Sequence, residues 1–233
     1  MNLRRLLSVG AAALFSASLA DASMIMIQPI QVCDDTGFSC ANAGQELFAE
    51  AGNTIWAQAG LSLDFLNFTT FNSTLYQNLN ESTAASFGGL TGLGHGQNDN
   101  PLVIDLWFVR SIFGAYGEGW LGGNGIAIGD NVFSEGRLDT IAHELGHNLG
   151  LDHYSTSDYT LYLMAAGGVR TTPGSLSQIT PGSPGTDRLS SIEIATALSS
   201  PFVLDSPVPE TATIALTFTV LALFAGFGLK SRG

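Results

Sequence analysis

Charged side chains are scarce in this chain of 233 residues, since Asp, Glu, Lys and Arg together make up 12% of it. Basic residues are the scarcest: eight Lys and Arg stand against twenty Asp and Glu, and the formal net charge is −12. Half of the basic residues lie near the chain ends, at Arg4, Arg5, Lys230 and Arg232. The region between them is still more acidic, which argues against nucleic acid or an anionic surface as a partner. An acidic surface favours solubility and cationic substrates.

Cysteine and histidine are scarce as well. Cys33 and Cys40 are the only cysteines, and three of the four histidines lie between residues 143 and 153. A phosphate-binding loop is missing, because the glycine-rich segment 117–125 has no G-x-x-x-x-G-K-S/T pattern and no lysine nearby. The chemistry that the sequence offers is therefore concentrated in one stretch.

That stretch reads H-E-x-x-H-x-x-G-x-x-H. On a helix, His143 and His147 leave the same face one turn apart, so both rings can reach one metal ion. Gly150 can adopt the left-handed conformation that ends a helix, and the turn brings back His153 as a third ligand. Three histidines leave the fourth position of a tetrahedral zinc ion open for water, as in a catalytic site. Glu144 is the predicted general base. The alternative is a surface helix with scattered histidines.

The motif resembles the zinc-binding signature of the metzincin clan of metallopeptidases. The resemblance implies Zn²⁺ held by His143, His147 and His153, above a methionine in a tight turn, for which Met164 is the candidate. It also implies an α+β fold with a twisted mixed sheet, an active-site helix and a small C-terminal subdomain. Zinc would lower the pKa of its water toward about 7, and Glu144 would take a proton as that water attacks a peptide carbonyl. The implied activity is that of a zinc endopeptidase acting on proteins or peptides.

Two positions near the turn differ from well-known metzincins. Some members stabilise the oxyanion with a tyrosine two places after the turn methionine, where this chain has Ala166. Either zinc does this work alone or one of three nearby tyrosines substitutes: Tyr154, Tyr159 or Tyr162. Tyr154 also follows the third histidine, a position that distinguishes metzincin families, and it matches none of the well-known ones. The alternative role for Met164 is that of an ordinary core methionine.

The first 22 residues are typical of a secretory signal peptide. Two arginines precede an apolar run over residues 6–19, and an Ala-x-Ala cleavage site ends at Ala22. The chain is therefore expected to leave the cytoplasm. In an exported protein, Cys33 and Cys40 are expected to form a disulfide. The alternative, an inhibitory thiolate on zinc, is disfavoured because a strand predicted from residue 24 leaves no room for a propeptide.

Residues 205–233 resemble the PEP-CTERM sorting signal of Gram-negative bacteria, which an exosortase processes. Pro209-Glu210-Thr211 stands where the family usually has Pro-Glu-Pro. Residues 212–229 are apolar and uncharged, and just long enough for a transmembrane helix, while the basic residues after them favour a cytoplasmic end. The alternative is a plain C-terminal membrane anchor. Either interpretation places the catalytic domain on the outer side of a membrane, as a secreted or surface-linked protein.

The predicted catalytic domain spans residues 23–204. Apolar or alternating runs predict strands at 24–32, 61–68, 101–109 and 126–133. Helical spacing predicts helices at 41–59, 137–149 and 187–198, the second of them capped by Ser134 with Glu135 at its positive end. Residues 69–100, rich in Asn, Ser, Thr and Gly, are predicted to form a long loop with one or two helical turns. Metzincins have an antiparallel edge strand that pairs with the substrate, and the resemblance implies it within residues 120–128.

The fourth histidine, His95, lies in the polar segment 94–100. Asp and Asn oxygens suit hard cations, so a second metal site for zinc or calcium is one interpretation. The spacing matches no calcium loop, and the preferred interpretation of this segment is an exposed polar turn.

Two other functions remain beside that of a general endopeptidase. One is a non-catalytic, zinc-stabilised matrix or adhesion protein that keeps the fold as a scaffold. The intact Glu144 argues against it, because a scaffold needs no base there. The other is a narrow processing enzyme that acts on one co-exported partner.

Overall fold

The computed structural model describes residues 23–43, 46–91, 98–154 and 157–205. The predicted signal peptide, the sorting signal beyond residue 205 and His95 lie outside these ranges. In the described ranges, no helix is both long and apolar enough to cross a membrane.

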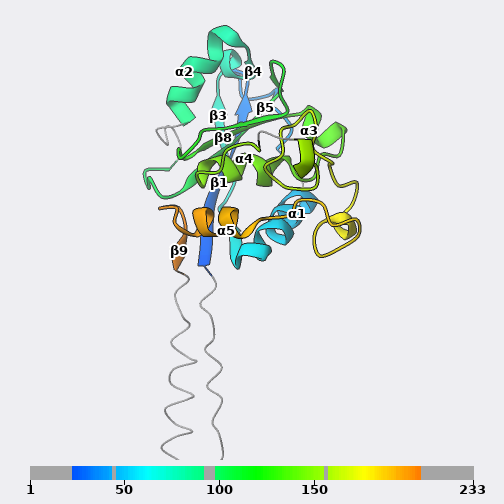
Figure 1. Ribbon diagram of the computed structural model, residues 1–233. Coiled ribbons are helices and arrows are strands. Elements are labelled where there is room, and N and C mark those ends of the chain that lie inside the picture. Colours follow the sequence, from blue (N-terminus) through cyan, green and yellow to red (C-terminus); the bar gives the residue numbers. More distant parts are fainter. Residues whose placement is uncertain (1–22, 44–45, 92–97, 155–156, 206–233) are drawn as a thin grey trace, which may run out of the picture.

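A mixed sheet is built around β1 (Ser23–Cys33), which is buried along most of its length (Figure 1). β2 (Leu61–Phe65) and β3 (Thr69–Asn72) pair in parallel with successive parts of one edge of β1. β9 (Leu204–Asp205) pairs antiparallel with the start of β1, so the two ends of the described chain lie side by side (Figure 1). The apolar run that predicted the first strand therefore marks a central strand.

The other side of β1 pairs in parallel with β5 (Ile104–Val109), which pairs in parallel with β8 (Gly125–Gly129). β7 (Gly117–Gly119) is antiparallel to β8 and forms this edge of the sheet. A separate small sheet joins β4 (Asn78–Leu79) to β6 (Ser111–Ile112). The predicted class, α+β with a twisted mixed sheet, is confirmed.

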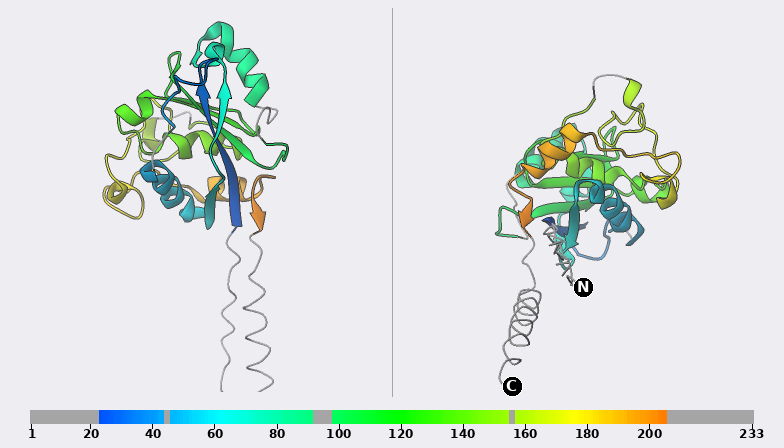
Figure 2. Two further views of the ribbon diagram at one scale, coloured as in Figure 1. Left: turned by 180° about the vertical axis from the view of Figure 1, so that it is seen from behind. Right: turned by 60° about the horizontal axis from the view of Figure 1, so that its bottom comes forward.

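Helices pack on both sides of the sheet, and α2 lies at the upper end of the molecule in the views from front and back (Figures 1 and 2). On one face lie α4 and α1, and on the other lies α2, whose Phe87 packs on Trp107 of β5. The helices are α1 (Glu46–Trp56), α2 (Glu81–Thr91), α3 (Asn131–Ser134), α4 (Thr140–Asn148) and α5 (Ser191–Leu198). Short 3-10 turns are η1 (Ala57–Ala59), η2 (Thr74–Tyr76), η3 (Ser157–Tyr159) and η4 (Leu176–Gln178).

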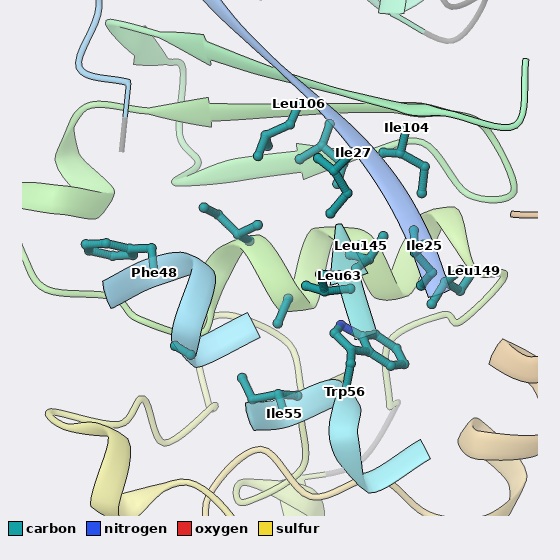
Figure 3. Close-up of a cluster of buried hydrophobic side chains, with 14 of the residues drawn as sticks. Ile25, Ile27, Phe48, Ile55, Trp56, Leu63, Ile104, Leu106, Leu145 and Leu149 are labelled. Carbon is teal, nitrogen blue, oxygen red and sulfur yellow. The ribbon is translucent and has the colours of Figure 1, made fainter. Parts of the chain in front are cut away.

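Alternating side chains of β5 supply both cores. Ile104 and Leu106 belong to the larger cluster, and Trp107 to the cluster under α2. In Figure 3, Leu145 of α4 and Leu149, the residue directly after this helix, lie between the sheet and Trp56 at the end of α1, and all three side chains are buried. α4 is therefore held on both sides by apolar packing, which fixes the helix that carries the first two histidines of the motif.

The prediction of a long loop with one or two helical turns over residues 69–100 is wrong for much of its length. The segment contains two strands, β3 and β4, and α2 is longer than two turns, while the short turn η2 agrees with the prediction. β3 forms by pairing with β1, a contact that local composition does not show. α2 has few apolar residues, and its start is fixed by Asn80, whose side-chain oxygen accepts from the backbone N–H groups of Ser82 and Thr83. β3 and α2 thus form through strand pairing and a polar N-terminal cap. Neither element has the hydrophobic periodicity on which a prediction from sequence depends.

Several predicted boundaries are also wrong. The strand predicted to reach residue 133 ends at Gly129, and the next residues form α3. Ser134 ends α3 and does not cap the active-site helix, which begins at Thr140. The helices predicted from residues 41 and 187 begin at Glu46 and Ser191. The disulfide between Cys33 and Cys40 is present.

Asp105 of β5 has no exposed surface, and neither of its carboxylate oxygens has a hydrogen-bond partner among the described residues. Burial raises the pKa of Asp105 from 3.8 to about 7. When folding raises the pKa of an acid, the native state binds the proton more tightly than the unfolded chain. The stability contribution of Asp105 is therefore present below about pH 4 and is lost as the pH rises through about 7.

We expect Asp105→Asn to be more stable than the wild type at about pH 8, by on the order of 3 kcal/mol, because the amide has no charge to bury. The advantage should shrink toward acid pH, where the carboxyl is protonated. Urea unfolding at about pH 5 and pH 8 measures this difference. Asp64→Asn, an exposed position on β2, is the control. Equal pH dependence in the two variants would show that Asp105 does not ionise in the native state as described.

Candidate functional site

Three histidine side chains converge at the C-terminal end of α4. His143 and His147 lie one turn apart on the helix, and the chain turns at Gly150, with φ of 91°, before His153. The Nε2 atom of His153 lies 3.0 Å from Nε2 of His143 and 3.2 Å from Nε2 of His147. The three side chains form a group that could hold a metal ion. The structure thus brings together all three predicted ligands.

Hydrogen bonds of the rings fix where their lone pairs lie. Nδ1 of His143 is 2.6 Å from the carbonyl oxygen of Leu163, and Nδ1 of His147 is 2.8 Å from that of Leu151. A carbonyl only accepts, so each Nδ1 carries the hydrogen and each neutral ring keeps a lone pair on Nε2. Nε2 of His153 can donate to only one of these two atoms. At least one lone pair therefore lacks a donor, and one cation with ligands at about 2.0–2.1 Å would satisfy all three.

Burial keeps the first two rings in the form that binds metals. His143 is 3% exposed and His147 is 9% exposed. Burial holds the pKa of His143 well below its ordinary value and lowers that of His147, in each case against the carbonyl hydrogen bond that favours the protonated ring. Since only the neutral imidazole is a ligand, the site needs little proton release before a metal binds. The donor set therefore fits a zinc ion.

The segment around Met164 lies directly beneath these rings. The carbonyl of Leu163 accepts from His143, and the carbonyl of Met164 accepts from the backbone N–H of Tyr154, the residue after His153. Met164 is fully buried, and a Cβ built on Gly146 would lie 2.4 Å from its sulfur atom. The predicted turn methionine is thus placed under α4, where it supports the backbone between two of the three histidines.

Glu144 lies between the helix and the edge strand. Its side chain is 7% exposed and borders the cavity that also holds the three histidines. Burial raises the pKa of Glu144 to about 7, against the positive charge of Arg170 and the N–H of Gly119. A Cβ on Gly117 would lie 2.7 Å from the Glu144 side chain, and one on Gly119 would lie 2.3 Å from the Glu144 carbonyl oxygen. The strand needs glycine at both positions to approach the helix this closely.

We expect Gly119→Ala to destabilise the protein by about 3 kcal/mol, because the new methyl group meets backbone rather than a flexible side chain. Thermal unfolding of the variant should show a lower midpoint than that of Gly167→Ala, the matched control. Gly167 also lines the cavity, but a Cβ there meets no atom within 4 Å. Similar midpoints for the two variants would show that β7 and α4 do not pack as closely as described.

A buried ion pair supports the start of α4, and the sequence did not predict it. Nε of Arg170 donates to Asp139 Oδ2 at 2.7 Å, with 3% and 0% of the side chains exposed. Asp139 is the residue before the helix, but its side chain makes no cap and instead binds the segment after Met164. Asp187 is buried beside it, and burial together with the Asp139 charge raises its pKa to about 8. The one signal in the sequence was an Asp in the first turn of the helix predicted over residues 137–149.

The cavity over the histidines has a volume of about 640 Å³ and is bounded by β7, α4 and the segment after Met164. None of the three tyrosines proposed for the oxyanion lines it. Tyr154 donates its hydroxyl to Ser190 Oγ at 3.2 Å, and Tyr159 and Tyr162 pack on its ring. Tyr116 is the tyrosine among the lining residues, which also include Gly114, Ala115, Gly117, Glu118, Gly119, Arg137, Thr140, Gly167, Gly168 and Arg170.

The predicted position of the edge strand is wrong. Residues 117–119 form the antiparallel edge strand β7, whereas most of the predicted range 120–128 forms the turn after it and the interior strand β8. Glycine lowers the β propensity of Gly-Glu-Gly, so the strand was not recognisable without its partners. Its free edge borders the same cavity as Glu144 and the histidines.

No family model matches the chain, and no curated protein matches it. Among solved structures, metalloproteinase-II from Bacteroides fragilis aligns at 16% identity and a TM-score of 0.49, over 77% of this chain and 53% of that one. Archaemetzincin from Archaeoglobus fulgidus aligns at 18% identity and 0.36, over 75% and 99%. A chain from a chaperone–substrate complex aligns at 14% and 0.48, over 78% of this chain and about a third of that one (34%). With all three TM-scores below 0.5, the function has to be argued from the site.

Proposed function

We propose that this protein is a zinc-dependent endopeptidase that hydrolyses peptide bonds outside the cytoplasm. The observation that carries the proposal is the convergence of three histidine Nε2 atoms, two of them with their hydrogens fixed on Nδ1, beside a buried Glu144 in one cavity. A structural zinc site would be closed by a fourth protein ligand. Among the described residues, the metal-binding group contains only the three histidines.

His143, His147 and His153 would hold the zinc ion. When bound, zinc would supply Lewis acidity that polarises a peptide carbonyl and lowers the pKa of water toward about 7. Glu144 is placed to take the proton from the attacking water and to deliver it to the leaving amine. Its side chain is held between α4 and the two glycines of β7, so it needs no rearrangement to face the cavity.

The edge of β7 offers a place for the peptide backbone. Among the described residues, β7 pairs with β8 on one side only. Apart from the Gly119 N–H, which faces the Glu144 carboxyl, the backbone groups on its other side are available for strand addition next to the cavity. A peptide bound there in extended form would place one carbonyl beside Glu144 and the histidines. The structure of the substrate region therefore favours an unfolded or extended chain as substrate.

Cleavage of an unstructured protein by the full-length, zinc-loaded chain tests the proposal. We expect fragments that appear with zinc, disappear with a chelator and return when zinc is restored. Binding of zinc without cleavage of any peptide in a broad library would overturn the general endopeptidase and favour a scaffold or a narrow processing enzyme. Cleavage that persists after the metal is removed would also contradict the proposal.

We also propose that the chain is exported and that an exosortase-like enzyme processes its C-terminus. The support is the signal-peptide pattern of residues 1–22 and the three-part pattern of residues 205–233. The disulfide between Cys33 and Cys40 is compatible with an oxidising compartment. Mass spectrometry of the protein isolated from its host should find new termini near residues 22 and 209. An intact chain at both ends would contradict the proposal.

A further inference from the structure

Positive charge gathers on one wall of the cavity in an otherwise acidic protein. The described part of the chain has four arginines, and two of them, Arg137 and Arg170, line the cavity. Both lie toward the N-terminal end of α4, since Arg137 precedes the helix and Arg170 binds Asp139 at its start. The wall therefore lies on the side of Glu144 that faces the start of α4.

The two arginines differ in how their charge is balanced. Arg170 is neutralised by the buried carboxylate of Asp139. Arg137 makes no ion pair within the described part of the chain, and its guanidinium lies over the ring of Tyr116, 4.1 Å from the ring centre. Its Nε is buried without a hydrogen-bond partner. Arg137 is thus a cation at the cavity wall with an unused donor.

A second unused polar atom lies on the same wall. Thr140 also lines the cavity, is 1% exposed, and its hydroxyl oxygen has no hydrogen-bond partner among the described residues. A buried hydroxyl and a buried guanidinium N–H that lack partners are costly to the folded protein. Both atoms have almost no accessible surface, so a rotation of the two side chains would be needed to turn these donors toward a carboxylate in the cavity beside the Arg137 guanidinium. Hydrogen bonds to a charged partner are the stronger kind.

No acidic side chain of the described residues forms an ion pair with Arg137. Glu135, an exposed residue, accepts the hydroxyl of Tyr116 at 2.5 Å. Glu118 lines the cavity from the edge strand, and Glu144 faces the histidines. None of the three is within ion-pair distance of Arg137. The negative charges of these glutamates repel a ligand carboxylate elsewhere in the cavity. A ligand carboxylate would therefore bind favourably only beside Arg137 and Thr140.

The direction of β7 along α4 indicates which part of a bound peptide lies near Arg137. Along the chain, Tyr116 lies over Arg137, Gly119 contacts Glu144, and the Gly122 N–H donates to the carbonyl of His147. We take the commoner antiparallel pairing for a peptide added to β7, so that the peptide runs from the His147 end to the Arg137 end. Residues after the cleaved bond therefore meet Arg137.

We propose that Arg137, together with Thr140, selects an aspartate or glutamate side chain immediately C-terminal to the cleaved bond. The inference rests on the proposed peptidase function and names its substrate class. It runs against the overall charge of the protein, which by itself favours cationic peptides.

Cleavage-site mapping with a degenerate library of short peptides tests the assignment. The full-length, zinc-loaded protein should cut before Asp or Glu about tenfold to hundredfold faster than before Asn or Gln, the ratio expected for hydrogen bonds to a charged group. Arg137→Gln should lose this preference, and Arg137→Glu should shift it to Lys and Arg. Arg110→Gln, which removes the same charge at an exposed arginine bonded to Ser39, should keep it. An unchanged preference in Arg137→Gln would overturn the proposal.

A binding experiment separates this inference from the proposed activity. Immobilised Glu144→Ala protein is exposed to the same library, and the retained peptides are sequenced. Enrichment of acidic peptides that disappears in the Glu144→Ala/Arg137→Gln double variant supports the acidic subsite, even if no peptide is ever cleaved. Equal retention of acidic and neutral peptides by both proteins would overturn it, whether or not the wild type is a peptidase.

Discussion

Glu144→Gln is expected to lower kcat for peptide hydrolysis by about 10²- to 10⁴-fold, the usual contribution of a positioned general base. The amide has nearly the shape of the carboxyl, so it keeps the contacts with Gly117 and Gly119 while losing the ability to accept a proton. Because Glu144 is not one of the three converging side chains, zinc binding should be unchanged. The loss should therefore appear in kcat and not in zinc content.

Steady-state hydrolysis of an unstructured peptide, with zinc content measured on the same samples, distinguishes the roles. Glu50→Gln, an exposed glutamate on α1, is the matched control and should behave as the wild type. A Glu144→Gln protein that keeps its zinc and more than about a tenth of its activity would show that another group takes the proton. Loss of zinc from this variant would instead make Glu144 part of the metal site.

Arg170→Met is expected to destabilise the protein by about 3–5 kcal/mol, because it leaves the carboxylate of Asp139 buried and unpaired. Nothing else in the described structure offers Asp139 a positive partner, and Asp187 beside it is another acid. The pair connects the start of α4 to the segment after Met164. Loss of the ion pair should weaken the packing between α4, which carries His143, and the segment around Met164, where the Leu163 carbonyl accepts from the His143 ring.

A double-mutant cycle separates the charge from the packing. Asp139→Leu/Arg170→Met removes both charges, and we expect it to be clearly more stable than Arg170→Met alone, since replacing a buried pair costs less than breaking it. Urea unfolding gives the free energies, and Arg110→Met is the control for loss of an exposed arginine. Additive effects of the two substitutions would show that the pair is not coupled in the native state.

The motif was readable from sequence because its geometry is local. His143 and His147 are placed by helical spacing alone, and Gly150 has the positive φ that its identity suggested. The central strand β1 was recognisable from a long apolar run, and the pairing of Cys33 with Cys40 from their being the only cysteines. Each of these depends on residues close together in the chain.

Features that depend on distant contacts were not predictable. The edge strand Gly117–Gly119 has no strand-forming side chains and exists because β8 pairs with it on one side and α4 requires a close approach. Arg170 and Asp139 are 31 residues apart, and nothing in the spacing links them. Arg137 looked like the first residue of a helix, and only the fold shows that it lines the cavity. The sequence thus located the candidate metal ligands but not the walls around them.

The zinc content of the full-length protein tests the central claim most directly. The protein is saturated with zinc, dialysed and analysed for metal, beside a variant in which His143, His147 and His153 are all replaced by alanine. The account predicts one zinc ion per chain in the wild type and none in the variant. Absence of zinc from the wild type, or equal zinc in both proteins, would contradict it.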